Sequence, residues 1–402
     1  MSPKQSILTL NGGSSSIRFA CYSLNGESPA RWATGKLDGI GGSHQKLVFH
    51  DLREQFPQES ALPPGTSLLD WIDKELSFDS ITAVGHRVVH GMQRTGPEIV
   101  TDELLDDLRK YSLFDPEHLP REIDLMDVLQ QRNSKLLQVA CFDTAFHRAM
   151  PRVARLLPIP RRFEAQGIER YGFHGLSYTF LMQELARVAG VPASSGRVIL
   201  AHLGNGASMA ALHGGKCIDT TMGFTPAGGL PMGTRAGDLD AGLAAYLLRS
   251  SGLNPDEFSR LVHLESGLLG ISETSSDMRD LLAAQSSDIR AGEAVDLFCY
   301  QARKWIGAFA ASLGGLDTLV FAGGIGENSP EVRVRICAGL GFLGIDIDET
   351  KNTGNAAIIS SIEARCCVRM IRTDEESVIA NIVFDTLKSR KEAPLNGRLE
   401  ED

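Results

Sequence analysis

The sequence predicts an α/β protein built from two related domains. The chain has 402 residues, which is more than one hydrophobic core ordinarily organises. Apolar strands alternate with helix patterns, and the succession of strand, glycine-rich turn and strand occurs near residue 7 and again from residue 198. A period this long indicates duplication of a whole domain and not an array of short repeats.

Composition and charge restrict the classes of partner. The chain is 43% apolar and 22% charged, with a net charge of −10. It has no long basic run, which argues against nucleic acid or an anionic membrane as the main partner. The seven cysteines include no C-x-x-C pair. Without a secretory signal or an apolar stretch of transmembrane length, this pattern predicts a cytoplasmic protein with reduced thiols.

The first half of the chain reads as strands followed by a capped helix. Buried strands are expected over residues 7–10, 17–24, 81–84 and 136–142, the first two forming a hairpin. Thr101 is a suitable N-cap for a helix whose first turn carries Asp102 and Glu103, since acidic groups suit the helix dipole there. The strand over 136–142 ends at Asp143. The last stretch, 391–402, is a polar tail.

The second half repeats the pattern. Strands are expected over 198–203, 209–212, 217–220 and 319–321. Residues 293–313 have the apolar period of a helix with one buried face, ended by Gly314. Ser329, Pro330 and Glu331 have the order of an N-cap, a first helical residue and a first-turn acid, so another helix is expected to start there.

Three glycine-rich turns each follow an apolar strand, at residues 10–16, 203–208 and 321–329. Glycine permits positive φ and lets a ligand approach the backbone closely. Ser and Asn side chains with bare N–H groups suit a phosphate anion. Three such turns in one chain predict a nucleotide held by its phosphates.

Neither a P-loop, a dinucleotide fingerprint nor the protein-kinase motif set is present. Phosphate turns inside paired β-hairpins are typical of the actin, hexokinase and heat-shock-chaperone ATPase superfamily. Longer segments make the resemblance specific, because in order from residue 6 to about 382 the chain resembles the acetate, propionate and butyrate kinase family. The matching segments are 10–19, 85–91, 142–147, 170–175, 201–208, 232–238, 266–272 and 324–330.

The resemblance implies two duplicated actin/hexokinase-like (ribonuclease H-like) domains, each a mixed sheet with flanking helices, with a cleft between them. Residues 1–147, completed by a C-terminal helix at about 376–390, would form the acyl-substrate side. Residues 148–375 would bind the nucleotide and form a homodimer.

The implied reaction is reversible in-line phosphoryl transfer from ATP to acetate, giving acetyl phosphate and ADP, with Mg²⁺ as cofactor and Mn²⁺ as an alternative. Two other readings stay open: propionate or butyrate as the acceptor, and a non-kinase ATPase of the same superfamily.

Two arginines are candidates for the chemistry on physical grounds. The acceptor carboxylate and the phosphoryl group are both anions, so a cation must hold them together, and Arg87 and Arg235 each offer a fork of donors. The resemblance adds Asp143 and His174 as catalytic residues. It implies that Arg87 also binds the substrate, beside an acyl pocket walled by Val89, Phe173 and Pro226.

The resemblance also implies cofactor sites. The metal would be held at Asn11 and Glu375, although Glu375 also fits the acidic first turn of a helix. The nucleotide would contact Asn11, Arg18, His202, Gly204, Asn205, Gly206, Asp277, Met278, Arg279, Gly324, Ile325, Gly326 and Asn328.

The chain departs from the family pattern at two places. Glu117 stands where the family has a leucine of the acyl pocket, and Leu119 follows shortly after. Leu176 and Tyr178 replace the threonine and histidine that follow Gly-Phe-His-Gly in the family. Since one methylene changes discrimination by only about 1–3 kcal/mol, these differences leave the preferred acyl chain open. We expect Glu117 to point away from the substrate or to pair with Arg121.

Overall fold

The computed structural model describes residues 5–13, 16–39, 45–54, 56, 58–62 and 66–392. The chain forms two compact units, one of residues 1–145 with 374–402 and the other of residues 146–373. Glu375 therefore belongs to the first unit, whereas the division expected from the sequence placed it in the second. Ser14 and Ser15 of the first glycine-rich turn and the tail from residue 393 lie outside the described residues.

The first unit is built on a mixed sheet in the order β5-β4-β3-β2-β1-β6-β8-β7. β1 pairs antiparallel with β2 and parallel with β6, and β6 pairs parallel with β8. The strands are β1 (Ser6–Gly12), β2 (Ser16–Ser23), β3 (Ala30–Asp38), β4 (Lys46–Asp51), β5 (Gln58–Ala61), β6 (Ile81–Val88), β7 (Glu98–Ile99) and β8 (Leu137–Phe142). The hairpin and the buried strands predicted from the sequence are confirmed.

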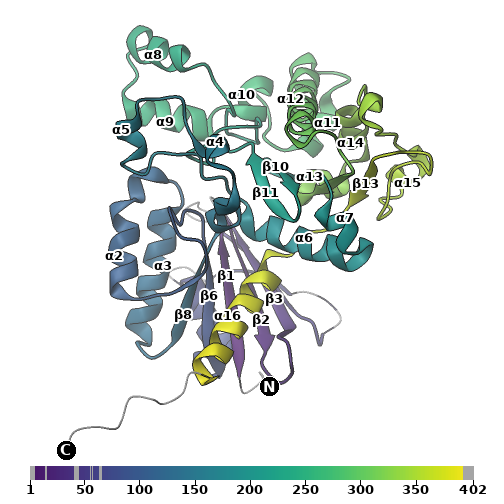
Figure 1. The fold of residues 1–402 in the computed structure, drawn as a ribbon. Helices are drawn as coiled ribbons and strands as arrows, with labels where there is room; N and C mark the ends of the chain where they lie inside the picture. The colour runs from purple at the N-terminus through teal and green to yellow at the C-terminus, as the bar shows by residue number, and fades with distance from the viewer. Residues whose placement is uncertain are drawn as a thin grey trace, which may run out of the picture. The chain divides into compact units, whose positions relative to one another are not determined.

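Helices cover this sheet: α1 (Leu68–Leu76), α2 (Asp102–Lys110), α3 (Leu119–Arg132) and α16 (Glu375–Glu392), with short turns η1 (Phe78–Ser80) and η2 (Ser112–Phe114). Thr101 caps α2 as predicted, since its side chain accepts a hydrogen bond from the Leu104 N–H. α1 and the end of α3 pack on a core that includes Leu8, Phe19 and Val84. α16, drawn in yellow in Figure 1, crosses the sheet and contacts β1 and β6.

The second unit has a five-stranded sheet in the order β11-β10-β9-β12-β13. Its strands are β9 (Val198–Leu203), β10 (Ala207–His213), β11 (Lys216–Thr220), β12 (Thr318–Ala322) and β13 (Cys367–Met370). β9, β10 and β11 are antiparallel neighbours, and β12 is parallel to both β9 and β13. The first unit has the same order and directions in β3-β2-β1-β6-β8, so the two sheets share one topology, as the internal repeat predicts.

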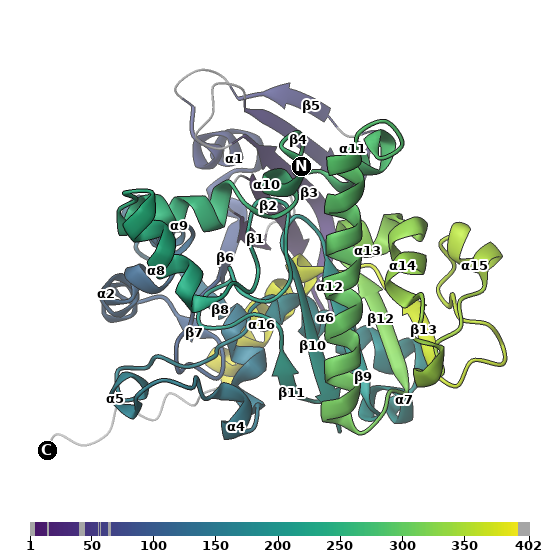
Figure 2. The same cartoon turned by 90° about the horizontal axis from the view of Figure 1, so that it is seen from above.

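The long helix α12 (Ile289–Leu313) is confirmed and runs beside the second sheet (Figure 2). Gly314 ends it with φ +70. α6 (Gly175–Ala189) packs through Tyr178, Leu181 and Leu185 onto residues of β9 and β10. The other helical segments are η3 (Asp143–Ala149), α4 (Arg152–Arg155), α5 (Arg161–Glu164), α7 (Val191–Ser195), α8 (Ala241–Ser250), α9 (Pro255–Leu264), α10 (Gly267–Ser272), α11 (Met278–Ala284), α13 (Gly323–Asn328), α14 (Pro330–Cys337), η4 (Gly341–Leu343) and α15 (Glu349–Thr353).

Two local expectations were wrong. The third glycine-rich segment is not an open turn but the short helix α13, whose first N–H, on Gly323, donates to the Glu327 carboxylate at 3.0 Å. Ser329 occupies the N-cap position of α14, yet its side chain makes no capping hydrogen bond.

The cysteines are free, and six of the seven are buried. Burial raises the pKa of the Cys21 thiol to about 12, which keeps it protonated and unreactive. Within the described part of the chain, no helix has the length and apolar character needed to cross a membrane.

Gly85 tests how tightly α16 packs on β6. A Cβ added there would lie 2.3 Å from Ile379 Cγ2 and 2.7 Å from Val383 Cγ2. We predict that Gly85→Ala lowers the free energy of unfolding by about 1–3 kcal/mol, because overpacking must push α16 away from the sheet. Urea denaturation followed by circular dichroism measures this. Gly96→Ala is the matched control, since nothing lies within 4 Å of its added Cβ; equal effects of the two substitutions would contradict the prediction.

Candidate functional site

The first unit carries a buried ion pair at one edge of its sheet. Arg87 lies near the carboxyl end of β6, and Asp143 directly follows β8, the parallel neighbour of β6. Arg87 Nε and Nη2 donate to Asp143 Oδ2 at 3.0 and 2.6 Å. Asp143 is fully buried and the Arg87 side chain is 13% exposed. Because carboxyl ends of parallel strands share an edge, the fold brings these two predicted residues together.

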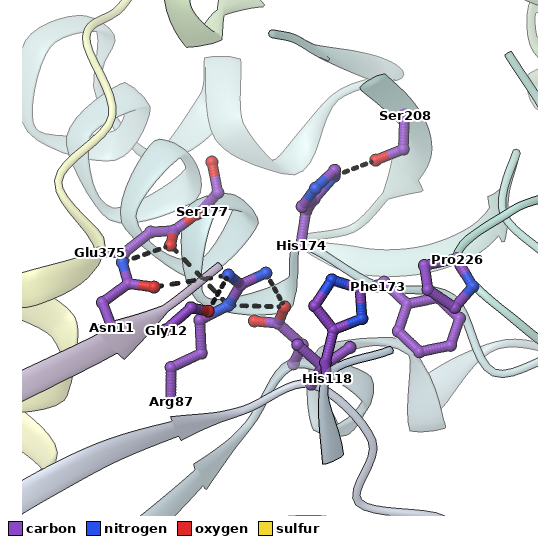
Figure 3. A network of polar contacts seen from close by, with 12 residues as sticks. Asn11, Gly12, Arg87, His118, Phe173, His174, Ser177, Ser208, Pro226 and Glu375 are labelled. Atoms are coloured by element: carbon purple, nitrogen blue, oxygen red, sulfur yellow. Dashed lines mark hydrogen bonds and ion pairs between the residues drawn. The ribbon is translucent and has the colours of Figure 1, made fainter. Parts of the chain in front are cut away.

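Asn11, at the end of β1, joins this pair to the start of α16 (Figure 3). Arg87 Nη1 donates to the Gly12 carbonyl at 3.2 Å and to Asn11 Oδ1 at 3.4 Å. Asn11 Nδ2 donates to Glu375 Oε2 at 2.9 Å and to Glu376 Oε1 at 3.0 Å. Three chain segments far apart in sequence thus meet at one network around Arg87.

Burial and the charges in this network shift the pKa values of its members. Burial works to lower the pKa of Arg87, but the negative charges of Asp143 and Glu375 outweigh it and raise that pKa. Burial raises the pKa of Glu375, and the nearby Asp143 adds to the increase. Burial and the charge of Glu375 raise the pKa of Glu376 as well. Two adjacent carboxyl groups in this state would be stabilised as anions by a further cation.

This donor set fits Mg²⁺ in the mode that uses one or two carboxylates together with phosphates and water. Glu375 and Glu376 supply the carboxylates, and they also form the acidic first turn of α16, so both interpretations of Glu375 describe the same position. No cluster of three or more His, Cys, Asp or Glu side chains suited to a metal is found among the described residues. Asn11 directs its amide nitrogen at the two glutamates, so it orients their carboxylates. In this orientation its side chain does not offer an oxygen ligand to the metal ion.

A cavity of about 630 Å³ opens within the first unit beside Arg87. Its walls are largely apolar and include Leu10, Leu37 and Leu125, while His118 and Glu122 lie among its polar lining. The lining does not include Val89, one of the predicted acyl-pocket residues, whose side chain is 3% exposed.

Sequence reasoning missed Glu122, which is only 7% exposed. Its Oε2 accepts a hydrogen bond from the Val89 N–H at 3.0 Å. An acid in the first turn of a helix is ordinarily exposed, so the sequence offered no signal for this contact. Glu117 is half-buried, and no ion pair joins it to Arg121 among the described residues, so its orientation away from the substrate stays a prediction. Its neighbour His118 instead contacts Asp115, with Nδ1 and Oδ1 2.9 Å apart.

In the second unit, His174 precedes α6 in the left-handed backbone region, with φ +59. A non-glycine residue rarely adopts this conformation unless its surroundings hold it. His174 Nδ1 lies 2.8 Å from Ser208 Oγ (Figure 3), and its ring stacks on His202 at 4.4 Å between centroids. The ring is therefore held from two sides.

The second glycine-rich turn lies against His174 and Arg235. A Cβ added to Gly206 would lie 3.3 Å from His174 Nε2 and 3.9 Å from Arg235 Nη1. Arg235 Nη1 also donates to the Pro226 carbonyl at 3.3 Å. The structure thus groups a glycine turn with bare backbone, an imidazole and a guanidinium, which is an arrangement suited to phosphate oxygens. Phe173 and Pro226, predicted as acyl-pocket walls, are buried in this unit.

Ser177 and Tyr178, which follow His174 in α6, contact the residues that hold its ring. Tyr178, where the family has histidine, is fully buried and its hydroxyl contacts Ser208 Oγ, the same atom that holds His174. Ser177 Oγ lies 2.7 Å from His202 Nδ1. Sequence reasoning placed Ser208 in the second glycine-rich turn but did not assign Ser177 or Tyr178 to the site, because their roles come from contacts with His202 and Ser208 that are distant in sequence.

The remaining predicted nucleotide residues fall into two groups. Gly323 packs closely on β9, since a Cβ there would lie 2.7 Å from the Leu203 carbonyl oxygen, and a Cβ on Gly204 would lie 3.7 Å from the Gly324 nitrogen. The second and third glycine-rich segments are therefore neighbours. In α13, Gly324 is exposed, Ile325 is half-buried and Gly326 is buried, while Asn328 Nδ2 donates to the Gly324 carbonyl at 2.9 Å. Asn205 is exposed in its turn.

The segment 277–279 is the second group. Asp277 caps α11 and pairs with Arg279 at 2.5 Å, leaving the Arg279 side chain 89% exposed. Met278 is 3% exposed, so it packs inside the unit. Arg18 is exposed on β2 and belongs to the first unit.

Comparisons with known proteins agree on one family. Residues 6–381 match the family described as the Acetokinase family. The chain is 42% identical over 391 residues to an acetate kinase of Rhodopseudomonas palustris (strain TIE-1), covering 94% of this chain and 97% of the relative. It is 40% identical over 399 residues to the acetate kinase of Bacteroides thetaiotaomicron, covering 95% and 99% of the two chains.

Solved structures agree. The crystal structure of Porphyromonas gingivalis acetate kinase has 32% identity and a TM-score of 0.83, covering 96% of this chain and 99% of that one. A propionate kinase from Francisella tularensis subsp. tularensis SCHU S4 has 34% identity and a TM-score of 0.86, covering 95% and 99%. The predicted fold class and family resemblance are confirmed.

Gly206 provides a test of the group around His174. We predict that Gly206→Ala weakens ADP binding by about tenfold, or roughly 1.4 kcal/mol, because the methyl group occupies the space between the turn and the His174 ring. Isothermal titration calorimetry measures the affinity. Gly307→Ala, in α12, is the control because its added Cβ meets nothing within 4 Å. Unchanged ADP affinity in a folded Gly206→Ala variant would contradict the assignment.

Proposed function

We infer that this chain, which belongs to the acetokinase family, is an ATP-dependent carboxylate kinase that converts acetate and ATP to acetyl phosphate and ADP, and the reverse. The match over residues 6–381 carries this conclusion. The two groups of residues around Arg87 and around His174 support it, because each provides a cation among donors suited to one of the two anionic reactants.

We assign the carboxylate to Arg87. Asp143 and the Gly12 carbonyl fix its guanidinium from two directions, so the fork keeps one orientation without the substrate. A pre-oriented donor costs little reorganisation when the acid binds and holds one carboxylate oxygen ready for attack on phosphorus.

We assign the phosphoryl group to His174 and Arg235. Phosphoryl transfer passes through a loose transition state with charge on three equatorial oxygens, so catalysis depends on donors placed around them. His174 Nε2 and Arg235 Nη1 both approach Gly206 and would donate to these oxygens, while the turn at 204–206 and α13 would receive the remaining phosphates. The cleft implied by the resemblance stays a prediction.

We propose that Glu375 and Glu376 hold Mg²⁺, with Asn11 orienting them. The bound ion would neutralise charge on the nucleotide phosphates. Cytoplasmic location and a homodimer formed by the second unit are further expectations from the family.

Arg235 tests the assignment to the transferring group. We predict that Arg235→Ala lowers kcat by about 10³–10⁵ with the fold retained, since a transition-state arginine typically contributes that much. A coupled assay for ADP measures kcat, and circular dichroism checks the fold. Arg187→Ala, which removes an exposed arginine paired with Glu184, should leave kcat unchanged. Near-normal turnover of folded Arg235→Ala would refute the role.

The acyl acceptor is tested by trapping acyl phosphates with hydroxylamine at saturating ATP. We expect acetate to give the highest kcat/KM, with propionate and butyrate lower by about 10- to 200-fold at most, the range set by a methylene in an apolar pocket. Higher kcat/KM with propionate would favour a propionate kinase, an alternative supported by the likeness to the Francisella enzyme and by Glu117 at the position of a leucine of the acyl pocket. ATP hydrolysis with no trapped product would instead favour a non-kinase ATPase.

A further inference from the structure

Glu122 makes an unusual contact with the end of β6. It lies in the first turn of α3, yet the residue is only 7% exposed. Its Oε2 accepts the Val89 N–H, two residues after Arg87 in the chain. β6 ends at Val88, so this N–H lies beyond the strand, and Glu122 provides its acceptor. The glutamate therefore fixes the backbone that carries Arg87.

The other oxygen of Glu122 favours the neutral form of the carboxyl group. Oε1 is buried and has no hydrogen-bond partner among the described residues. A carboxylate anion buried with an oxygen left unpaired is strongly disfavoured, whereas a protonated carboxyl needs far less solvation. Asp115 before α3 and Asp143 after β8 add negative charge around it, and the positive charge facing it is that of Arg87, which is itself paired with Asp143.

Burial and the neighbouring acids together determine the direction in which the pKa of Glu122 shifts. Burial raises the pKa of Glu122 well above its usual value, and the charge of Asp115 raises it further, against the smaller effects of the Val89 N–H and Arg87. Glu122 also lines the cavity beside Arg87, together with His86, His118 and Arg121. The cavity gives protons and solvent a route to a residue that is otherwise enclosed.

We propose that Glu122 is a positioning residue for the carboxylate substrate, acting as an uncharged hydrogen-bond acceptor that holds the Val89 N–H and adds no further negative charge beside Arg87. This inference rests on the proposed binding of the carboxylate at Arg87. It assigns Glu122 no bond to the substrate.

Ionisation of Glu122 should weaken binding of the carboxylate substrate. Below the raised pKa of Glu122 the carboxyl is neutral and does not oppose the bound acid. As the pH rises through that value, the glutamate becomes an anion near Arg87 and repels the substrate carboxylate. The KM for the acid should therefore rise as the pH passes through the pKa of Glu122, while the KM for ATP changes less.

The test compares Glu122→Gln with Glu122→Leu in the full-length enzyme. Gln keeps an oxygen for the Val89 N–H and cannot ionise, so its KM for acetate should match that of the wild type at pH values where Glu122 is neutral and should not rise with pH above them. Leu removes the acceptor, and we expect the KM for acetate to increase about tenfold, the scale of one buried N–H left unpaired, with the KM for ATP unchanged. Glu75→Leu in α1, where the glutamate side chain is 44% exposed, is the control and should match the wild type.

Three results would overturn the proposal. The first is a Glu122→Gln variant as impaired as Glu122→Leu. The second is a rise in the KM for acetate with pH that persists in Glu122→Gln. The third is a Glu122→Leu variant with unaltered KM for acetate. If Glu122→Leu does not fold, the Gln variant and its pH profile still decide. Failure of the proposed function would look different, because the wild type itself would then trap no acyl phosphate.

Discussion

Parallel pairing of β6 with both β1 and β8 is the constraint on which the network around Arg87 depends. It fixes three strand ends at one edge of the sheet, and each end contributes a polar group: Asn11, Arg87 and Asp143. The ion pair between Arg87 and Asp143 survives burial because both partners are fixed by these strands and share further hydrogen bonds. Were β6 to shift by one residue, Arg87 would point to the other face of the sheet.

The same architecture serves a different ligand in the second unit. There the sheet edge presents glycine-rich backbone at 204–206 and the start of α13, while its charged and aromatic groups come from neighbouring segments, Arg235 and His174. The first unit thus presents fixed side chains and the second presents open backbone. A duplicated topology has diverged in the kind of donor that it offers at equivalent strand ends.

Much of the fold could be predicted because the apolar runs are strong and the turns carry glycine. Most of the strands that line the two sites follow from these patterns, as do Thr101 as a cap and Gly314 as a helix end. β6 was predicted too short because Gly85 and His86 interrupt its apolar run, although pairing on both sides continues the strand to Val88. α13 was missed because its glycines read as a turn, while the Glu327 carboxylate that satisfies its first N–H lies at its far end.

The sequence predicted residues of the candidate site only where they lie in a recognisable motif. Arg87 and Arg235 stand in glycine-bearing segments, so their chemistry could be inferred from the residues. Glu122 could not, because its role comes from a contact with Val89, 33 positions away. Tyr178 likewise acquires its role from Ser208 on a strand that follows it.

The placement of α16 has a consequence for biosynthesis. The first unit is discontinuous, since its sheet is made early and the helix that packs against Gly85 comes only after residue 373. The second unit is one continuous segment and contains all of its strands. On the ribosome, where domains generally fold as units in the order of synthesis, the middle of this chain can reach its native packing first. The amino-terminal sheet must wait, with one apolar face uncovered, until translation has delivered its final helix.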